Sequence, residues 1–266
     1  MACTRPLALC AVMLALAGCA SDPDFLGERT IQHAKAVDTP PARVQTKTVS
    51  YREDSPATAP PVPLPSWKVA AAVKPGAASN PPLTPTNLFE RVGPSVYGVK
   101  VVQEAGSKVA TSYGSAVAVS PREAITNCHI ISQGRLITLS NGAATLPAEV
   151  SAADRRSDRC YLRVISGTLE PVSGIRDFDG LAVGETVYTI GSPKGLERTL
   201  GQGLLSGLRK MEGVEYVQIT APVSEGSSGG GLFDERGNLI GITTFTVRDS
   251  QNLNFAIAAS EYWNTK

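Results

Sequence analysis

The sequence is poor in histidine and has no excess of charge of either sign. Two of its 266 residues are histidine, and 25 basic against 24 acidic residues leave a formal net charge of +1. Binding to nucleic acid or to an anionic membrane through charge needs a basic excess, so we expect neither a nucleic-acid partner nor a polybasic membrane patch. The five cysteines are not spaced as a tetrahedral metal cluster, so we expect no metal ion and no cofactor.

The apolar run at residues 7–17 is too short to span a bilayer as a mature helix. Because Arg5 precedes it, we interpret residues 1–18 as a secretory signal peptide. Residues 16–19 (LAGC) resemble the bacterial lipobox, which implies cleavage before Cys19 and a lipid on Cys19. The resemblance implies a lipid-anchored protein of the bacterial cell envelope. The lack of an aspartate after Cys19 favours the outer membrane, facing the periplasm. The alternative is an ordinary secretory signal that is cleaved nearby.

Residues 19–85 are rich in proline, alanine, serine and threonine, with prolines clustered at 40–41, 60–65 and 81–82. Repeated proline removes backbone donors and fixes φ, which prevents a sheet or a long helix. The segment has too few clustered apolar residues to build a core. We interpret it as a disordered, semi-extended tether between the lipid and a folded domain. Recognition of the proline clusters by a partner is the alternative.

A glycine-rich segment at residues 226–230 (GSSGG) follows one strand-like run and precedes another. Glycine permits positive φ and close approach of other atoms. A nucleophilic serine needs such a sharply turned backbone, which exposes its hydroxyl and directs N–H groups at an oxyanion. Ser228 is therefore the candidate nucleophile. The alternative is a glycine-rich hairpin loop without chemistry.

A serine hydroxyl is a weak nucleophile until a base takes its proton. His33 lies in a proline-rich polar segment, so His129 is the candidate base, in an apolar run at residues 124–131 that we expect to be a strand. Asp158 is the candidate acid that orients the imidazole. It begins residues 158–164, where apolar positions alternate and which we also expect to be a strand. Taken singly, such a histidine is more often structural, and an aspartate at a strand start is common in turns.

Five segments in the same order resemble the trypsin-like serine proteases, and most closely the HtrA/Deg family of the bacterial envelope. They are residues 126–131 (TNCHII), 158–162 (DRCYL), 184–193 (GETVYTIGSP), 226–230 (GSSGG) and 253–257 (LNFAI). The chain order of histidine, aspartate and serine also fits that fold.

The resemblance implies an all-β fold of two six-stranded antiparallel barrels, of the chymotrypsin or trypsin type, in a protease domain at residues 86–266. His129 and Asp158 would come from the first barrel and Ser228 from the second. The residue pattern is compatible with this, because short β runs separated by turn signals predict barrels or a sandwich. We expect a short helix at residues 86–92, capped by Thr86 or Asn87.

The resemblance also implies a serine endopeptidase that works through an acyl-enzyme, with the backbone N–H groups of Gly226 and Ser228 as the oxyanion hole. The backbone of Thr244, Phe245 and Thr246 would pair with an extended peptide substrate added as a strand.

The position six residues before the nucleophile carries aspartate in relatives that cleave after arginine or lysine, and here it is Pro222. By its match, Leu253 narrows the floor of the same pocket. An apolar pocket cannot offset the desolvation of a charged side chain. We therefore expect cleavage of unfolded or extended polypeptides after small or medium apolar residues such as alanine or valine.

Cys128 and Cys160 are the cysteines that remain once the signal is removed and Cys19 carries lipid. The resemblance brings their neighbours His129 and Asp158 together, so we hypothesise a disulfide between Cys128 and Cys160. Two buried free thiols remain an equal alternative.

The sequence departs from the family in the loop that shapes the oxyanion hole. Ser227 replaces asparagine, residues 224–225 (SE) replace Asn-Pro, and Gly231 replaces proline, which bears on resting activity. The chain ends at Lys266, soon after the last expected strand, so we expect no peptide-binding PDZ domain. The loop at residues 104–107 is short, so we expect no large cage.

Two other functions stay open. One is a non-proteolytic lipoprotein that keeps the fold as a binding module, against which the complete set of three side chains argues. The other is an esterase, against which the expected peptide-pairing strand argues.

Overall fold

The structure is a computed structural model that describes residues 81–105, 108–131, 136–142, 144–192, 198–246 and 252–263. The expected signal peptide, Cys19 and the tether up to residue 80 lie outside the described residues. In the part that is described, no helix is long and apolar enough to cross a membrane.

Helix α1 (Pro85–Val92) precedes the first barrel. Its cap is Thr84, whose side chain accepts a hydrogen bond from the backbone N–H of Asn87 at 3.3 Å. The prediction of Thr86 or Asn87 as the cap is wrong. Pro85 has no N–H and suits the first helical position, which places the cap one residue earlier.

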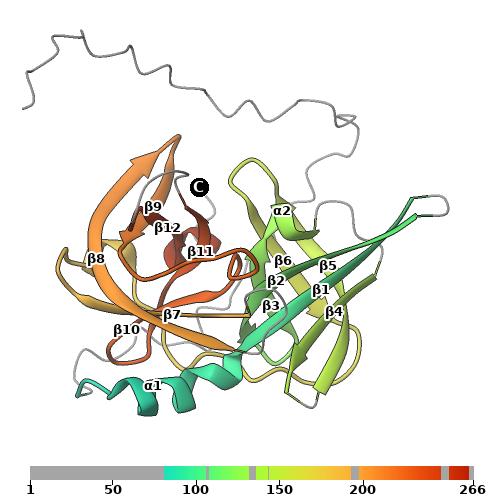
Figure 1. Cartoon of the computed structure of the whole chain (residues 1–266), viewed down its shortest axis with the longest axis horizontal. Helices are drawn as coiled ribbons and strands as arrows, with labels where there is room; N and C mark the ends of the chain where they lie inside the picture. The colour runs from blue at the N-terminus through green and yellow to red at the C-terminus, as the bar shows by residue number, and fades with distance from the viewer. Residues whose placement is uncertain are drawn as a thin grey trace, which may run out of the picture. The chain divides into compact units, whose positions relative to one another are not determined.

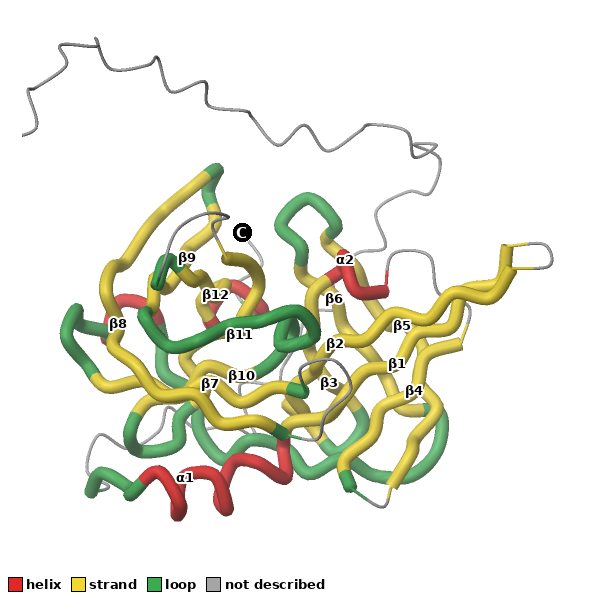
Figure 2. The backbone as a smooth tube through the Cα atoms, in the orientation of Figure 1, coloured by secondary structure: helices red, strands yellow, loops and turns green. Residues whose placement is uncertain are grey.

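The first barrel is a closed sheet of six antiparallel strands in the order β1-β2-β3-β6-β5-β4. Its strands are β1 (Val96–Ala105), β2 (Lys108–Ser120), β3 (Glu123–Asn127), β4 (Leu136–Asn141), β5 (Ala144–Asp154) and β6 (Arg159–Val164). A short helix, α2 (Cys128–Ile131), follows β3 among these strands (Figure 2). Every backbone edge of the barrel is paired, so the sheet leaves no open edge strand.

The second barrel is closed in the same way, in the order β10-β11-β12-β9-β8-β7. Its strands are β7 (Thr186–Gly191), β8 (Thr199–Met211), β9 (Val214–Ile219), β10 (Gly231–Asp234), β11 (Leu239–Thr246) and β12 (Asn254–Ala258). The short 3-10 turns are η3 (Gly93–Ser95), η4 (Phe178–Gly180) and η6 (Ala259–Tyr262). Figure 1 shows the two barrels side by side. The predicted fold of two six-stranded antiparallel barrels is confirmed.

Three clusters of buried hydrophobic side chains hold this arrangement. One lies within each barrel, and the third contains residues of both barrels and of α1. The third cluster includes Leu88, Val117, Ile125, Tyr161, Phe233, Leu239 and Ile257. Burying one such side chain stabilises the fold by about 1.5–3 kcal/mol. The third cluster therefore fixes how the first barrel sits on the second.

Two predicted strand boundaries are wrong where the candidate site is formed. The run at residues 124–131 is strand only as far as Asn127, after which α2 turns the chain. Asp158 does not begin a strand, because its φ of +57° closes the turn before β6. Aspartate accepts this left-handed conformation more readily than most residues. The turn and α2 bring the side chains of Asp158 and His129 together, which two straight strands would not do.

A disulfide joins Cys128, the first residue of α2, to Cys160 in β6, with their Cα atoms 4.9 Å apart. Both side chains are buried. The bond closes a loop with a sequence separation of 32 residues. It ties the start of the helix that carries His129 to the strand that follows Asp158.

We expect a double variant, Cys128→Ala with Cys160→Ala, to lose about 3–4 kcal/mol of unfolding free energy, because its unfolded chain regains the entropy of the open loop. Guanidinium unfolding of the oxidised proteins measures this. Wild type unfolded with a reductant present should approach the double variant. Equal midpoints for oxidised wild type and the double variant would contradict a stabilising cross-link.

Candidate active site

The first barrel holds His129 and Asp158 in direct contact. His129 Nδ1 lies 2.7 Å from Asp158 Oδ2, and the backbone N–H of His129 donates to Asp158 Oδ1 at 2.8 Å. The two bonds fix the imidazole relative to the carboxylate. The His129 side chain is 40% exposed and that of Asp158 is 24% exposed, so the pair lies at the surface and is accessible from solvent.

The second barrel adds a third hydrogen bond to the same carboxylate. Thr244 Oγ1, near the end of β11, donates to Asp158 Oδ2 at 3.1 Å. A carboxylate that accepts three hydrogen bonds has little freedom to rotate away from the imidazole. The contact also links the acid of the first barrel to the strand that runs beside Ser228 in the second.

Ser228 lies on the turn between β9 and β10, and its side chain is half-buried. Its Oγ donates to the backbone carbonyl of Thr244 at 3.0 Å. Among the described residues, no hydrogen bond joins Ser228 Oγ to His129. Rotation about χ1 gives a serine hydroxyl a different partner, and catalytic hydrogen bonds often tighten only when substrate is bound.

The backbone around Ser228 depends on glycine. Gly226 has φ of +88° and Gly229 has φ of +84°, which other residues rarely adopt. A Cβ on Gly229 would lie 2.0 Å from the carbonyl oxygen of Ser115. Within the described residues, the N–H groups of Gly226 and Ser228 donate to no acceptor, whereas those of Ser227, Gly229 and Gly230 do. The glycine at position 231 also has a structural explanation, because a Cβ there would lie 2.3 Å from the ring of Phe233.

A partly buried ionic cluster holds the turn that carries Asp158. Arg159 bonds Asp154 at 2.7 Å and Glu261 of η6 at 3.2 Å, and its Nε donates to Ser157 at 2.7 Å. Burial alone raises the pKa of Asp154, but hydrogen bonds from Ser157 and Arg159 outweigh it and hold this pKa below its usual value. Asp154 is therefore ionised and paired, and the cluster connects the turn to the end of the second barrel.

The predicted substrate-binding residues lie around the end of β11. Pairing of β10 with β11 reaches Ile242, and Thr244 forms a bulge in the pairing with β12. Phe245 is 39% exposed and stacks on Phe255 with ring centroids 4.9 Å apart. Beyond the bulge, Thr246 pairs with the first residue of β12.

Asn254 is a residue that the sequence prediction missed. Its Nδ2 donates to the carbonyl of Ala221 at 2.8 Å, and its Oδ1 accepts from Thr246 Oγ1 at 2.8 Å. This buried amide bridges β11 and the segment that leads to the exposed Pro222. Leu253, which the sequence suggested as a pocket floor, is half-buried beside it.

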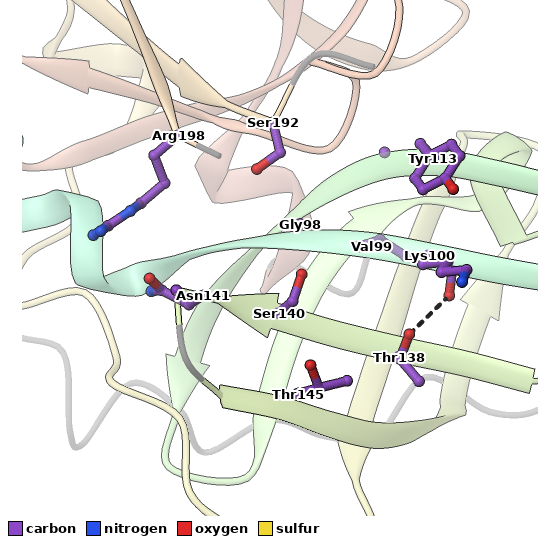
Figure 3. A pocket seen from close by; sticks show the side chains of 12 residues that line it. Gly98, Val99, Lys100, Tyr113, Thr138, Ser140, Asn141, Thr145, Ser192 and Arg198 are labelled. Carbon is purple, nitrogen blue, oxygen red and sulfur yellow. Dashed lines mark hydrogen bonds between the residues drawn. The ribbon is translucent and has the colours of Figure 1, made fainter. Parts of the chain in front are cut away.

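A pocket of 340 Å³ lies elsewhere, between the outer face of the first barrel and the segment after β7 (Figure 3). Its lining includes Lys100, Tyr113, Ser140, Ser192 and Arg198, and none of the three candidate catalytic residues. In Figure 3 Lys100 and Arg198 lie at opposite ends, so their charges do not converge on one point. Among the described residues, no group of three metal-binding side chains is present.

Comparisons with known proteins match the same part of the chain. A family model described as "Trypsin-like peptidase domain" matches residues 114–242. The periplasmic pH-dependent serine endoprotease DegQ of Escherichia coli is 28% identical over 228 residues, which is 73% of this chain and 50% of DegQ. The serine protease HTRA4 of Mus musculus is 29% identical over 184 residues, covering 64% of this chain and 38% of that protein.

A solved structure of the HtrA-type protease AlgW with a tripeptide has the same fold. It superposes with a TM-score of 0.61 at 26% sequence identity, and the match covers 68% of this chain and 61% of that one. The chain thus spans half or less of the length of DegQ and HTRA4. The two closed barrels and the matched segments lead to one conclusion: residues 114–242 belong to a trypsin-like peptidase domain, whose similar relatives and solved structures are HtrA-type serine proteases.

Proposed function

We propose that the chain is a serine endopeptidase with Ser228 as nucleophile, His129 as general base and Asp158 as the acid that orients the base. The observation that carries the proposal is the pair of hydrogen bonds, 2.7 and 2.8 Å long, by which Asp158 holds both the ring and the backbone of His129. This is the arrangement that an imidazole needs in order to accept a proton on its other nitrogen.

In the proposed reaction, Ser228 Oγ leaves the carbonyl of Thr244 and turns towards Nε2 of His129. It attacks a peptide carbonyl carbon while its proton moves to Nε2, and Asp158 stabilises the imidazolium through Nδ1. The tetrahedral oxyanion accepts hydrogen bonds from the N–H groups of Gly226 and Ser228. The imidazolium then returns the proton to the leaving amine, and water releases the acyl-enzyme by the same steps.

The proposed substrates are unfolded or extended polypeptides, which add as a strand to the backbone of Thr244, Phe245 and Thr246. The end of β10 pairing at Ile242 supports this, because it leaves that side of β11 open next to Ser228. The related protease AlgW has been solved with a tripeptide and with a decapeptide.

We propose that the substrate pocket accepts small or medium apolar residues such as alanine or valine. The segment from Ala221 to Pro222 has no carboxylate that would pair with arginine or lysine. The Asn254 bridge to Ala221 and Thr246 supports a shallow pocket, because the amide occupies the space between them. Leu253, the residue before Asn254, is included in the proposed pocket floor by its sequence match.

The proposed location is the bacterial cell envelope, with the domain tethered by the segment after Cys19 to a lipid on Cys19 in the outer membrane. The expected end of the tether at residue 85 is wrong, because Leu83 N donates to Glu235 O and Pro85 is the first residue of α1. The names of related proteins support the periplasmic side, since DegQ and the DegP-like relatives are described as periplasmic endoproteases. The lipobox-like residues 16–19 support the anchor.

We expect Ser228→Ala to lower kcat on unfolded casein on the order of 10⁶-fold and to abolish labelling by a fluorophosphonate, because no nucleophile remains. Ser173→Ala, which changes an exposed serine, is the matched control and should behave as wild type. Equal casein cleavage by wild type and Ser228→Ala would refute the proposal. If wild type is labelled but does not cleave casein, the result would favour the esterase. If wild type is neither labelled nor active on casein, the result would favour the binding module.

We expect Asn254→Gly to shift cleavage towards larger apolar residues such as leucine. Removal of the amide deepens the pocket, and one methylene in such a pocket changes the rate by about 10–200-fold. Asn252→Gly is the matched control, because Asn252 is exposed with φ of +60°, which glycine adopts freely. Mass spectrometry of cleavage sites in a denatured protein measures the shift. If Asn254→Gly cleaves at the same sites as wild type, Asn254 does not form the floor of the substrate pocket. Cleavage by wild type mainly after charged residues would contradict the proposal of an apolar pocket.

We expect Cys19→Ser to move the protein out of the membrane fraction and to prevent incorporation of labelled palmitate, because the thiol carries the lipid. Cys10→Ser, in the signal peptide, should fractionate as wild type. Recovery of Cys19→Ser in the same membrane fraction as wild type would contradict a lipid anchor.

A further inference from the structure

Ser115 in β2 is a fully buried residue that belongs to neither the triad nor the substrate strand. Its backbone N–H donates to the carbonyl of Ser228 at 2.8 Å, and its Oγ donates to the carbonyl of Gly226 at 2.9 Å. The same Oγ accepts from the backbone N–H of Ser192 at 2.8 Å, and the Ser115 carbonyl accepts from Thr126 at 2.7 Å. Three of these four bonds cross from the first barrel to the second.

Around Ser115 the two barrels lie so close together that no side chain fits between them. A Cβ on Gly229 would lie 2.0 Å from the Ser115 carbonyl oxygen, and one on Gly191 would lie 3.2 Å from Ser115 Oγ. A serine hydroxyl has one proton and two lone pairs. Because the N–H of Ser192 takes a lone pair of Ser115 Oγ, the proton is left to point at the carbonyl of Gly226.

That carbonyl belongs to the turn that precedes the nucleophile. Ser227 N donates to Ser224 O at 2.8 Å, which closes a β-turn with Gly226 in its third position at φ of +88°. Glu225 is not among the residues with positive φ, so the turn is of type II. In a type I turn the peptide between Glu225 and Gly226 is turned over. The carbonyl of Glu225 would then take the direction of the Gly226 N–H.

Gly226 suits the third position of a type II turn, which requires positive φ. Proline in the second position would also preset φ, but here that residue is Glu225. Two side-chain hydrogen bonds hold this turn from outside: Thr243 Oγ1 donates to Ser227 O at 2.7 Å, and Ser115 Oγ donates to Gly226 O. The bond from Ser115 is the one that reaches Gly226 itself.

We propose that Ser115 is a positioning residue for the proposed oxyanion hole: it fixes Gly226 against the first barrel through its Oγ and Ser228 through its backbone N–H, so that the N–H groups of both residues keep their places. The inference rests on the proposed function, because it assigns a role within the same reaction. Ser115 itself contacts neither the substrate nor the reacting atoms.

The test is Ser115→Ala, measured by the rate of fluorophosphonate labelling and by kcat and KM on a peptide substrate. Both the labelling rate and kcat should fall about tenfold or more, because one hydrogen bond that orients the hole is lost. KM should stay close to wild type. The affinity of the same peptide for Ser228→Ala should not change when Ser115→Ala is added. Ser260→Ala is the matched control, since Ser260 is equally buried and its hydroxyl has no partner among the described residues.

A rescue separates positioning from packing. Glu225→Pro, added to Ser115→Ala, should recover part of the lost labelling rate, because proline before Gly226 favours the type II turn. Should Ser115→Ala fail to unfold cooperatively, Ser115→Cys replaces it, and its weaker donor should give a rate between those of alanine and serine.

Labelling of Ser115→Ala at the wild-type rate would overturn this inference and leave the proposed function standing. A loss of rate accompanied by an equal loss of peptide affinity, without rescue by Glu225→Pro, would also overturn it, because that pattern shows general disruption. Absence of labelling in wild type would instead reject the proposed function, and this inference with it.

Discussion

The junction between the two barrels is the constraint on which the rest of the structure depends. The first barrel supplies His129 and Asp158, and the second supplies Ser228 and the strand beside it. A shift of one barrel against the other by about 1 Å would weaken the contacts between the groups that the proposed reaction needs. The shared hydrophobic cluster sets the overall position, and polar contacts refine it. Among them are the contacts of Ser115 with Gly226, Thr244 with Asp158, and Arg159 with Glu261.

Each barrel is also internally braced next to the junction. In the first, the disulfide and the hydrogen bonds from His129 to Asp158 hold α2 against the turn before β6. In the second, Gly229 N donates to Thr243 O and Thr243 N donates to Gly230 O, which fixes the loop after Ser228 to β11. The part left adjustable is the hydroxyl of Ser228, which moves by rotation about χ1, so substrate binding can complete the site without moving either barrel.

Local patterns of apolar residues and turn glycines predicted short strands in barrels or a sandwich, and the resemblance of five segments to a known family implied the two barrels and the roles of the three candidate residues. The sequence prediction failed at His129, where an apolar run looks like a strand but becomes α2, because tertiary contact with Asp158 overrides local propensity. It also missed Ser115 and Asn254. Ser115 lies 111 positions from its partner Gly226, and a single buried serine carries no local pattern that reveals such a partner. Asn254 was hidden in the same way, since its partners lie on other segments.

The central claim is that the two barrels bring His129, Asp158 and Ser228 into one catalytic unit. The most direct measurement is a crystal structure of the protein after reaction with a peptidyl phosphonate. The account predicts a bond from Ser228 Oγ to phosphorus, with the phosphoryl oxygen between the N–H groups of Gly226 and Ser228 and with His129 still held by Asp158. An adduct on another residue, or a phosphoryl oxygen directed away from those two N–H groups, would contradict it.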